Sequence, residues 1–254
     1  MTTNCLNCNA ELNGQFCSNC GQSSDTHTIN LHYLWHDIQH GLLHVDKGIL
    51  FTIKELFARP GHSIREFLQG KRVNHFKPIS LIIILAGVYS LLSHYFGLNL
   101  LTNYYKIDGN EKEINQLRTT VNDISEWFSL HYSILALLQI PVFSLGTYLC
   151  FKKSGYNFIE HFIINSFIAA QKLTLHIVAF PFYYLSVKTT YSQLPDQITD
   201  GIGLAISIWT IFQLFNYVPP FQRFWRTFLS LVIPYSIFIL IVIAGFYFMF
   251  HSFK

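Results

Sequence analysis

Long apolar stretches separated by short polar segments dominate the chain from residue 78 onward. A helix that crosses a membrane needs roughly 20 mostly apolar residues. Five stretches reach or approach that length, at 79–101, 130–151, 162–187, 201–218 and 228–250. Three of them contain a proline, which packed membrane helices tolerate because neighbouring groups satisfy the freed carbonyl. The pattern predicts an all-α integral membrane fold with about five transmembrane helices across residues 78–254.

Two regions of different character precede these stretches. Residues 28–77 have the spacing of short amphipathic helices that lie in the cytosol or at the membrane interface. Residues 1–24 are polar and contain four of the five cysteines, so they form a separate small head.

Composition and charge support a membrane location and suggest an orientation. Charged residues make up 12% of the chain, against about 25% in soluble domains, and mean hydropathy is +0.31. The first 30 residues lack the apolar segment of a signal peptide, so we expect the N-terminus to stay in the cytoplasm. Basic loops alternate with acidic or near-neutral ones, which predicts a cytoplasmic N-terminus and a C-terminus outside. Nothing in the charge pattern indicates a nucleic-acid partner.

The head contains two CxxC pairs, Cys5–Cys8 and Cys17–Cys20, and Gly21 follows the second pair. Two such knuckles can place four thiolates tetrahedrally around one ion, and glycine permits the positive φ that a knuckle often needs. We predict a closed, structural or partner-binding zinc site; iron binds the same thiolate set. Two disulfides are the alternative, but a cytoplasmic head favours free thiols.

Four histidines follow one another at four-residue intervals, at His32, His36, His40 and His44. On a helix they form one slanting stripe, since each step advances only about 40°. We interpret the stripe as the polar face of an interfacial helix. A second metal ion or a haem held by His36, His40 and His44 is the alternative, although the Glu of a zincin HExxH motif is missing.

A short helix is expected between Ser63 as N-cap and Gly70 as its closing residue. Basic side chains gather around and after it, ahead of the first predicted span. A cluster of this kind attracts anionic lipid headgroups at about 1 kcal/mol per charge. Simple positive-inside anchoring explains the same pattern. The predicted headgroup contacts are Arg65, Lys71, Arg72 and Lys77.

The third predicted span is unusual because Lys172 and His176 lie inside it. An ionisable residue within a span is a candidate functional site by default. The alternative is that the span begins near Leu173 and the preceding residues form an interfacial helix. None of the predicted spans contains Asp or Glu, which disfavours proton or cation transport.

Several short motifs form a recognisable set: Cys5-x2-Cys8, Phe16-Cys17-Ser18-Asn19-Cys20-Gly21-Gln22, His44-Val45-Asp46-Lys47-Gly48, Arg59-Pro60-Gly61, Ile64-Arg65-Glu66-Phe67, Gly70-Lys71-Arg72 and Glu160-His161. This set resembles the bacterial DUF3667 membrane proteins, chiefly over residues 5–85. The resemblance implies a zinc-ribbon-headed, multi-pass protein of the bacterial inner membrane whose function is unknown. It implies no substrate, reaction or catalytic residue.

Three functional hypotheses follow. The leading one is a non-enzymatic scaffold or interaction protein, whose head binds a cytosolic protein partner and whose basic surface contacts membrane lipids. The second is a metal- or haem-dependent membrane enzyme that uses the histidine stripe, with Glu160 and His161 brought close by folding. The third is a lipid or small-molecule carrier in which Lys172 and His176 line a cavity. The sequence contains no GxSxG, phosphate-binding loop or HExxH motif, so we lean away from an enzyme.

Overall fold

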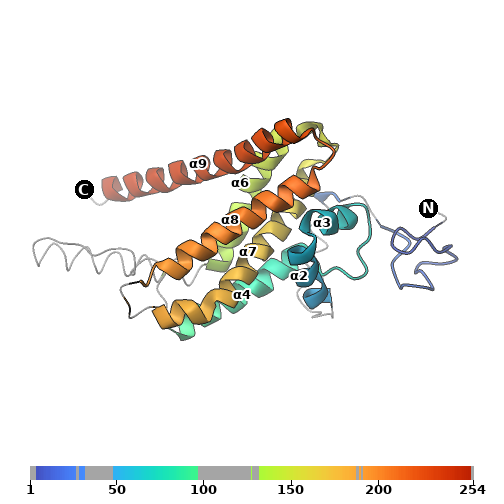
Figure 1. Ribbon diagram of the computed structural model, residues 1–254, viewed down its shortest axis with the longest axis horizontal. Helices are drawn as coiled ribbons and strands as arrows, with labels where there is room; N and C mark the ends of the chain where they lie inside the picture. Colours follow the sequence, from blue (N-terminus) through green and yellow to red (C-terminus); the bar gives the residue numbers. More distant parts are fainter. Residues whose placement is uncertain are drawn as a thin grey trace, which may run out of the picture.

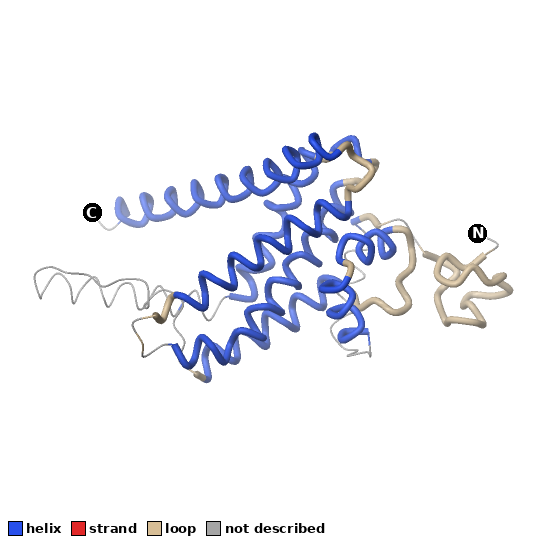
Figure 2. The backbone as a smooth tube through the Cα atoms, viewed as in Figure 1, coloured by secondary structure: helices blue, strands red, loops and turns tan. Residues whose placement is uncertain are grey.

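The computed structural model describes residues 4–26, 29–31, 48–96, 127, 132–186, 189 and 191–252. Apart from the head, the described chain is almost entirely helical (Figure 2). Its elements are α2 (Gly48–Ala58), α3 (Pro60–Leu68), α4 (Pro78–Tyr95), α6 (Tyr132–Cys150), the 3-10 helix η1 (Lys152–Ser154), α7 (Phe158–Ser186), α8 (Leu194–Leu214) and α9 (Pro220–Ser252). The histidine stripe and residues 97–126 lie outside the described residues.

Five long helices run back and forth along one bundle, and α7 lies at its centre against α4, α6 and α8. The last helix, α9, packs mainly on α6 and lies along the upper edge of the bundle in Figure 1. The cysteine head, α2 and α3 lie at one end of the bundle, and α9 finishes at the other (Figure 1). Along the chain, consecutive long helices of the bundle run in opposite directions (Figure 1).

Each of the five predicted spans falls on one of these helices, but their membrane character differs. Three are long and apolar enough to cross a membrane: α4, α7 and the Pro220–Ile241 part of α9. A shorter apolar helix, Ile134–Cys150, lies within α6. The remaining helix, α8, has Asp196 and Asp200 in its first two turns. The all-helical fold is thus confirmed, and the count of five crossings stays a prediction.

Three helices, α7, α8 and α9, begin earlier than the apolar pattern predicts. The α7 helix starts with a reciprocal cap: Glu160 N–H donates to Asn157 Oδ1 at 2.9 Å, and Asn157 N–H donates to Glu160 Oε2 at 2.7 Å. Both α8 and α9 begin with a proline in the first turn, where its missing N–H costs nothing.

The short helices α2 and α3, with residues 69–77, form a unit at the end of the bundle that we call the platform. The ring of Phe67 meets Phe167 of α7 edge to face at 5.1 Å, and Thr52 of α2 accepts the Phe76 N–H at 2.7 Å. The expected cap at Ser63 is wrong. The α3 helix already begins at Pro60, and Ser63 Oγ lies 2.9 Å from His75 Nε2 instead.

Candidate functional site: a four-cysteine metal centre and a cavity at Lys172

The two cysteine knuckles have the same backbone structure. In the first, Asn9 N–H donates to Cys5 O and Cys5 N–H donates to Ala10 O, both at 2.8 Å. The second repeats these bonds between Gly21 and Cys17 at 2.9 Å and between Cys17 and Gln22 at 2.8 Å. The residue after each pair has a positive φ, 61° at Asn9 and 75° at Gly21. In the sequence only Gly21 indicated a residue with positive φ, although asparagine is also tolerated in that conformation.

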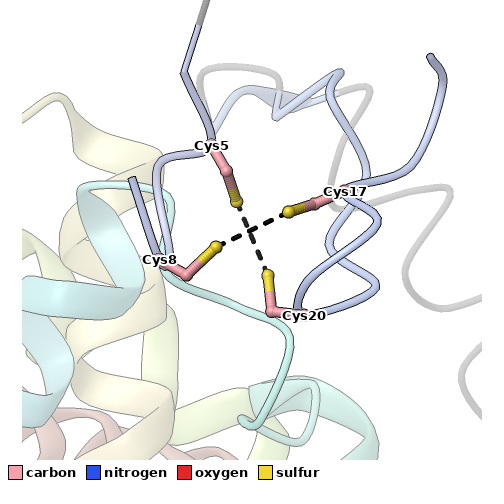
Figure 3. A group of neighbouring side chains, drawn as sticks. All are labelled: Cys5, Cys8, Cys17 and Cys20. Atoms are coloured by element: carbon pink, nitrogen blue, oxygen red, sulfur yellow. Dashed lines mark hydrogen bonds between the residues drawn. The ribbon is translucent and has the colours of Figure 1, made fainter. Parts of the chain in front are cut away.

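The four cysteine side chains point toward one centre (Figure 3). The sulfurs of Cys5 and Cys20 lie 3.6 Å apart and those of Cys8 and Cys17 lie 3.5 Å apart, with all four within 4.8 Å of one another. Four sulfurs held about 2.3 Å from a zinc ion would be about 3.8 Å apart. The four predicted ligands are therefore together in a set that fits a tetrahedral metal ion, and the cysteines are free thiols.

The electrostatic surroundings favour the metal-binding form of these thiols. Donation from the Ala10 N–H is the main reason that the pKa of Cys8 falls to about 6, with further donors at Asn19 and the neighbouring thiols acting against desolvation. A thiolate is the form that ligates metal. Lys71 lines the same hollow as Cys5 and Cys8, so a cation stands beside a site whose four thiolates exceed the charge of one divalent ion.

The head rests on the segment that follows α3. Gln22 Oε1 accepts the backbone N–H of Arg72 at 3.0 Å, directly after the second knuckle. Leu6, from the first knuckle, lies so close to Gly70 that a Cβ there would stand 2.7 Å from Leu6 Cδ1. Gly70 also has a φ of +100°, which side-chain-bearing residues rarely adopt. Both knuckles are thus fixed to the platform.

The start of α3 and the end of α8 cap each other. Gln213 Oε1 accepts the N–H groups of Gly61 at 2.7 Å and His62 at 3.4 Å, two donors that the helix itself leaves unpaired. In return Arg65 Nη2 donates to the carbonyls of Gln213, at 2.8 Å, and Leu214, and to Asn216 Oδ1 at 3.0 Å. A cation at a helix C-terminus also matches the helix dipole. Arg65, predicted as a lipid contact, therefore has its guanidinium held by the protein.

A cavity of about 510 Å³ lies between α6, α7, α8 and α9, near the middle of α7. Lys172 lines it. Its ammonium donates to Tyr235 OH at 3.3 Å and lies 5.5 Å from the ring centroid of Phe143 and 5.7 Å from that of Tyr235. Among the described residues, these aromatic groups surround the ammonium and no carboxylate forms an ion pair with it. The cation is held over π faces, an arrangement that leaves its charge available to a ligand.

A second polar group in the same cavity is built around His176. Its Nε2 lies 3.4 Å from Asp200 Oδ1, and its Nδ1 lies 2.9 Å from Tyr183 OH. Asp200 is 68% exposed, so this carboxylate stands at the cavity edge rather than within it. Lys172 and His176, the two residues singled out within the predicted third span, thus line one cavity, and α7 runs through both as a single continuous helix.

Glu160 and His161, proposed as partners of a histidine-based enzyme site, have other roles. The Glu160 carboxylate caps α7, as described above. The His161 ring is fully buried, with Nδ1 3.1 Å from Thr147 Oγ1 and its plane stacked on Phe215. Within the described residues the four cysteines are the only cluster of His, Cys, Asp or Glu able to hold a metal. His32, His36, His40 and His44 lie outside those residues, and the enzyme hypothesis stays a prediction.

Comparison with known proteins gives one match. Residues 46–90 match the family model described as protein of unknown function, DUF3667. The resemblance to DUF3667 is confirmed over this segment. No curated protein and no solved structure matches the chain. The cysteine head and Glu160-His161 lie outside the matched residues.

The DUF3667 segment spans α2, α3 and most of α4, and its motif residues hold the platform together. Arg59 bridges Glu55 at 2.5 Å and Glu66 at 3.1 Å, and Lys71 lies 3.7 Å from Glu66. Partial burial would raise the pKa of Glu66, but its bond to Arg59 and nearby cations outweigh burial and hold that pKa below its usual value.

Other basic residues of the DUF3667 segment also have partners in the platform. Arg72 donates through Nε to Phe67 O at 3.1 Å and lies over the Phe67 ring. The backbone N–H of the same residue donates to Gln22, so Arg72 contacts both α3 and the head. Headgroup binding by Lys71, Arg72 and Lys77 stays a prediction.

Three partners of Lys172 and His176 escaped the sequence analysis. Asp200 lies one residue before the predicted fourth span, yet α8 includes it. Tyr235 lies in an apolar stretch and Tyr183 lies in the aromatic segment 180–184, and both patterns are typical of ordinary membrane-facing or core residues. The sequence separation between Lys172 and Tyr235 does not indicate that they are in contact, since this pairing depends on how α7 and α9 pack. Tyr183, seven residues after His176, was the one partner detectable from helical spacing.

Proposed function

We propose that this chain is a multi-pass membrane protein that binds an anionic ligand at Lys172. The observation that carries the proposal is the position of this ammonium at the edge of a 510 Å³ cavity, with aromatic rings and a hydroxyl around it and no carboxylate partner among the described residues. Placing a charge at the centre of a membrane helix costs about 2.5–3.5 kcal/mol on insertion scales. A ligand anion would offset that cost.

The remaining polar groups are consistent with an oxyanion. Tyr235 OH, bonded to Lys172, can turn its own proton toward a ligand oxygen because a hydroxyl both donates and accepts. Asp200 would repel an anion, but it lies at the cavity edge beside His176 Nε2, which screens it when protonated. A phosphate, sulfate or carboxylate group therefore suits the cavity, and the volume lies in the range of small-molecule sites.

The head and platform complete the proposed picture. We infer that zinc occupies the four-cysteine site, since tetrahedral thiolate sets favour it. The head would be cytoplasmic, α4, α6, α7, α8 and α9 would make five crossings of a bacterial inner membrane, and the C-terminus would lie outside. In this arrangement the head stabilises the platform, and the exposed ring of Phe16, 66% accessible, offers a contact point for a cytosolic protein.

Native mass spectrometry of the detergent-solubilised protein tests ligand binding. Phosphatidylglycerol and phosphatidylcholine with identical chains are offered in equal amounts, and we expect phosphatidylglycerol to be retained preferentially. Removing one charge-assisted hydrogen bond costs about 1.5–3 kcal/mol, so Lys172→Met should reduce the preference roughly tenfold or more. Lys172→Arg should keep it. Lys153→Met, which removes an exposed cation away from the cavity, is the matched control.

A separate arm with inorganic phosphate identifies the source of the anion. Competition by millimolar phosphate would indicate a water-soluble ligand, whereas retention of phosphatidylglycerol under the same conditions would indicate a lipid headgroup. Equal retention of the two lipids by the wild-type protein, with no effect of phosphate, would contradict the proposal. An unchanged preference in Lys172→Met would also contradict it.

A further inference from the structure

An apolar groove of about 340 Å³ lies between α8 and α9. Its walls come from successive turns of both helices, and Thr227, Ser236 and the Tyr235 hydroxyl are the polar side-chain groups among them. Along α8 the lining residues are Leu204, Ile208 and Phe212, spaced four apart on one face. Along α9 the main apolar lining residues are Phe224, Phe228, Leu231, Val232 and Ile239.

The groove and the Lys172 cavity are neighbours that share part of their walls. Leu204, Leu231 and Tyr235 line both. Tyr235 is the link between them, because its hydroxyl contacts the Lys172 ammonium while the residue also forms a wall of the groove. We treat them as one site, with a cationic end at Lys172 and an apolar end between α8 and α9.

The apolar end opens toward the surroundings of the bundle. The α8 and α9 helices are joined by the short turn after Leu214 and diverge from there toward their far ends (Figure 1). Groove residues on both helices are exposed in the structure: Ile208 at 42%, Phe228 at 50% and Ile239 at 55%. In a bilayer this opening would face lipid chains, so a ligand could enter sideways from the membrane.

We propose that the site holds an anionic lipid, with its headgroup at Lys172 and one acyl chain in the α8–α9 groove. The inference rests on the proposed function and specifies its ligand class. Charge complementarity selects this occupant, since an apolar helix or a second copy of α9 laid in the groove would leave the Lys172 charge without a counter-ion. A lipid supplies an anion and an apolar chain in one molecule.

The acyl chain is expected to contribute little to the binding free energy. A chain that moves from the bilayer into the groove exchanges one apolar environment for another, because lipid tails are as apolar as leucine side chains. Chain length should therefore have little effect on affinity. The position of the chain is the informative measurement.

Photocrosslinking in vesicles measures that position. The probe is phosphatidylglycerol with a diazirine at the end of one acyl chain, diluted in unlabelled phosphatidylcholine, and adducts are mapped by peptide mass spectrometry. We expect adducts concentrated on residues 204–212 and 224–239. The phosphatidylcholine version of the probe should label these residues about tenfold less, and so should the phosphatidylglycerol probe on Lys172→Met.

A matched pair of variants tests the groove itself. Ile208→Trp fills it, whereas Ile202→Trp adds the same side chain at a similarly exposed position of α8, 46% accessible, that does not line the groove. We expect Ile208→Trp to remove most groove adducts and Ile202→Trp to keep them. A third measurement, the phosphatidylglycerol preference in native mass spectrometry, is made on both variants to confirm that the Lys172 end is intact.

The outcomes separate the two proposals. A headgroup preference that depends on Lys172, with adducts spread evenly over the outer helix faces, would overturn the groove assignment and leave the proposed function standing. Groove adducts that form equally with both headgroups would also overturn the groove assignment alone. Crosslinks between α8 and α9 of two copies of the chain, found in place of lipid adducts, would have the same consequence. Absence of any headgroup preference would overturn this inference, and it would overturn the proposed function as well if phosphate also has no effect.

Discussion

The side-chain oxygen of Gln213 accepts the backbone N–H of Gly61 at 2.7 Å, joining the last turn of α8 to the first turn of α3. The same glutamine offers its backbone carbonyl to Arg65. Each helix thus satisfies terminal groups of the other, and the close approach requires that residue 61 carry no side chain. Gly61 and Arg65 therefore act in one and the same joint.

Substituting Gly61 with alanine should destabilise the protein. A Cβ at this position would stand 2.7–2.8 Å from Gln213 atoms and closer still to the Leu214 backbone nitrogen, so α3 would have to move away from α8. Overpacking of this kind typically costs about 1–3 kcal/mol. Thermal unfolding in detergent is the measurement. Gly87→Ala is the control, because nothing lies within 4 Å of a Cβ there; equal melting temperatures for the two variants would argue against the joint.

Removing the Arg65 side chain should also lower stability. Arg65→Ala leaves two carbonyls at the end of α8 and the Asn216 side chain without their charged donor. A hydrogen bond to a charged group contributes about 1.5–3 kcal/mol to stability. Unfolding midpoints in detergent measure the loss. If Arg65 acts mainly on lipid headgroups, the variant would instead keep its midpoint and bind anionic vesicles less well.

The cysteine head should contain one metal ion per chain. Metal analysis of purified protein is expected to give one equivalent of zinc, and Cys17→Ser should lose it because three thiolates no longer close the tetrahedron. Cys150→Ser, outside the cluster, should retain the full equivalent. A head this small depends on its metal for folding, so protease cleavage within residues 4–26 should accelerate when a chelator is added. Full metal content in Cys17→Ser would contradict the four-ligand site.

Stability should fall when the pH drops below about 6.5, in part through His75. Burial lowers the pKa of His75 below its usual value of 6.5, while in the unfolded chain it returns to that value. Between the two pKa values the unfolded state binds a proton that the folded state does not, so acidification favours unfolding. Melting temperatures at pH 7.5, 6.5 and 5.5, with metal content checked at each pH, measure the slope.

His75→Gln provides the comparison for that slope, because glutamine keeps a polar partner for Ser63 without titrating. Glu66 acts in a separate window. Its lowered pKa gives stability that is present above its usual value of 4.5 and is lost as pH falls through the folded pKa. An identical slope between pH 7.5 and 5.5 in the variant and the wild type would show that His75 is not responsible.

Replacing Lys172 with methionine should raise the stability of the ligand-free protein. Methionine has a similar length, fills the same space beside Phe143 and Tyr235, and does not carry a charge among apolar helices. Substitutions that relieve a functional site commonly add about 0.5–2 kcal/mol. The melting temperature should therefore increase while anionic lipid preference is lost. A lower melting temperature would assign Lys172 a structural role instead.

The sequence predicted the elements whose signals are local. Hydrophobic stretches located the centres of α4, α6, α7, α8 and α9, and the two CxxC pairs located the four ligands of the head. Helix ends were less accurate, since hydropathy follows the apolar middle of a helix. The α8 helix continues back to Leu194 through Asp200, which is why a carboxylate of the cavity went unnoticed.

Contacts that depend on packing could not be predicted. No spacing rule connects Gln213 with Gly61, or Lys172 with Tyr235, because each pair comes from helices far apart in the chain. Ser63 was expected to cap a helix because serine is a frequent N-cap, yet a distant glutamine provides the acceptor. Lys172 and His176 were singled out by their polarity within a predicted span, and the cavity that both line could be recognised only from the fold.

The reciprocal joint between α3 and α8 limits how this molecule can be dissected. The matched DUF3667 segment ends at residue 90, whereas the acceptors for its helix amides and its arginine lie at residues 213–216. A recombinant fragment cut at the segment boundaries would keep only one half of this joint. Split-protein complementation between residues 1–96 and 132–254 would restore both halves. Any unit used for expression, transplantation or chimera building therefore has to contain both fragments.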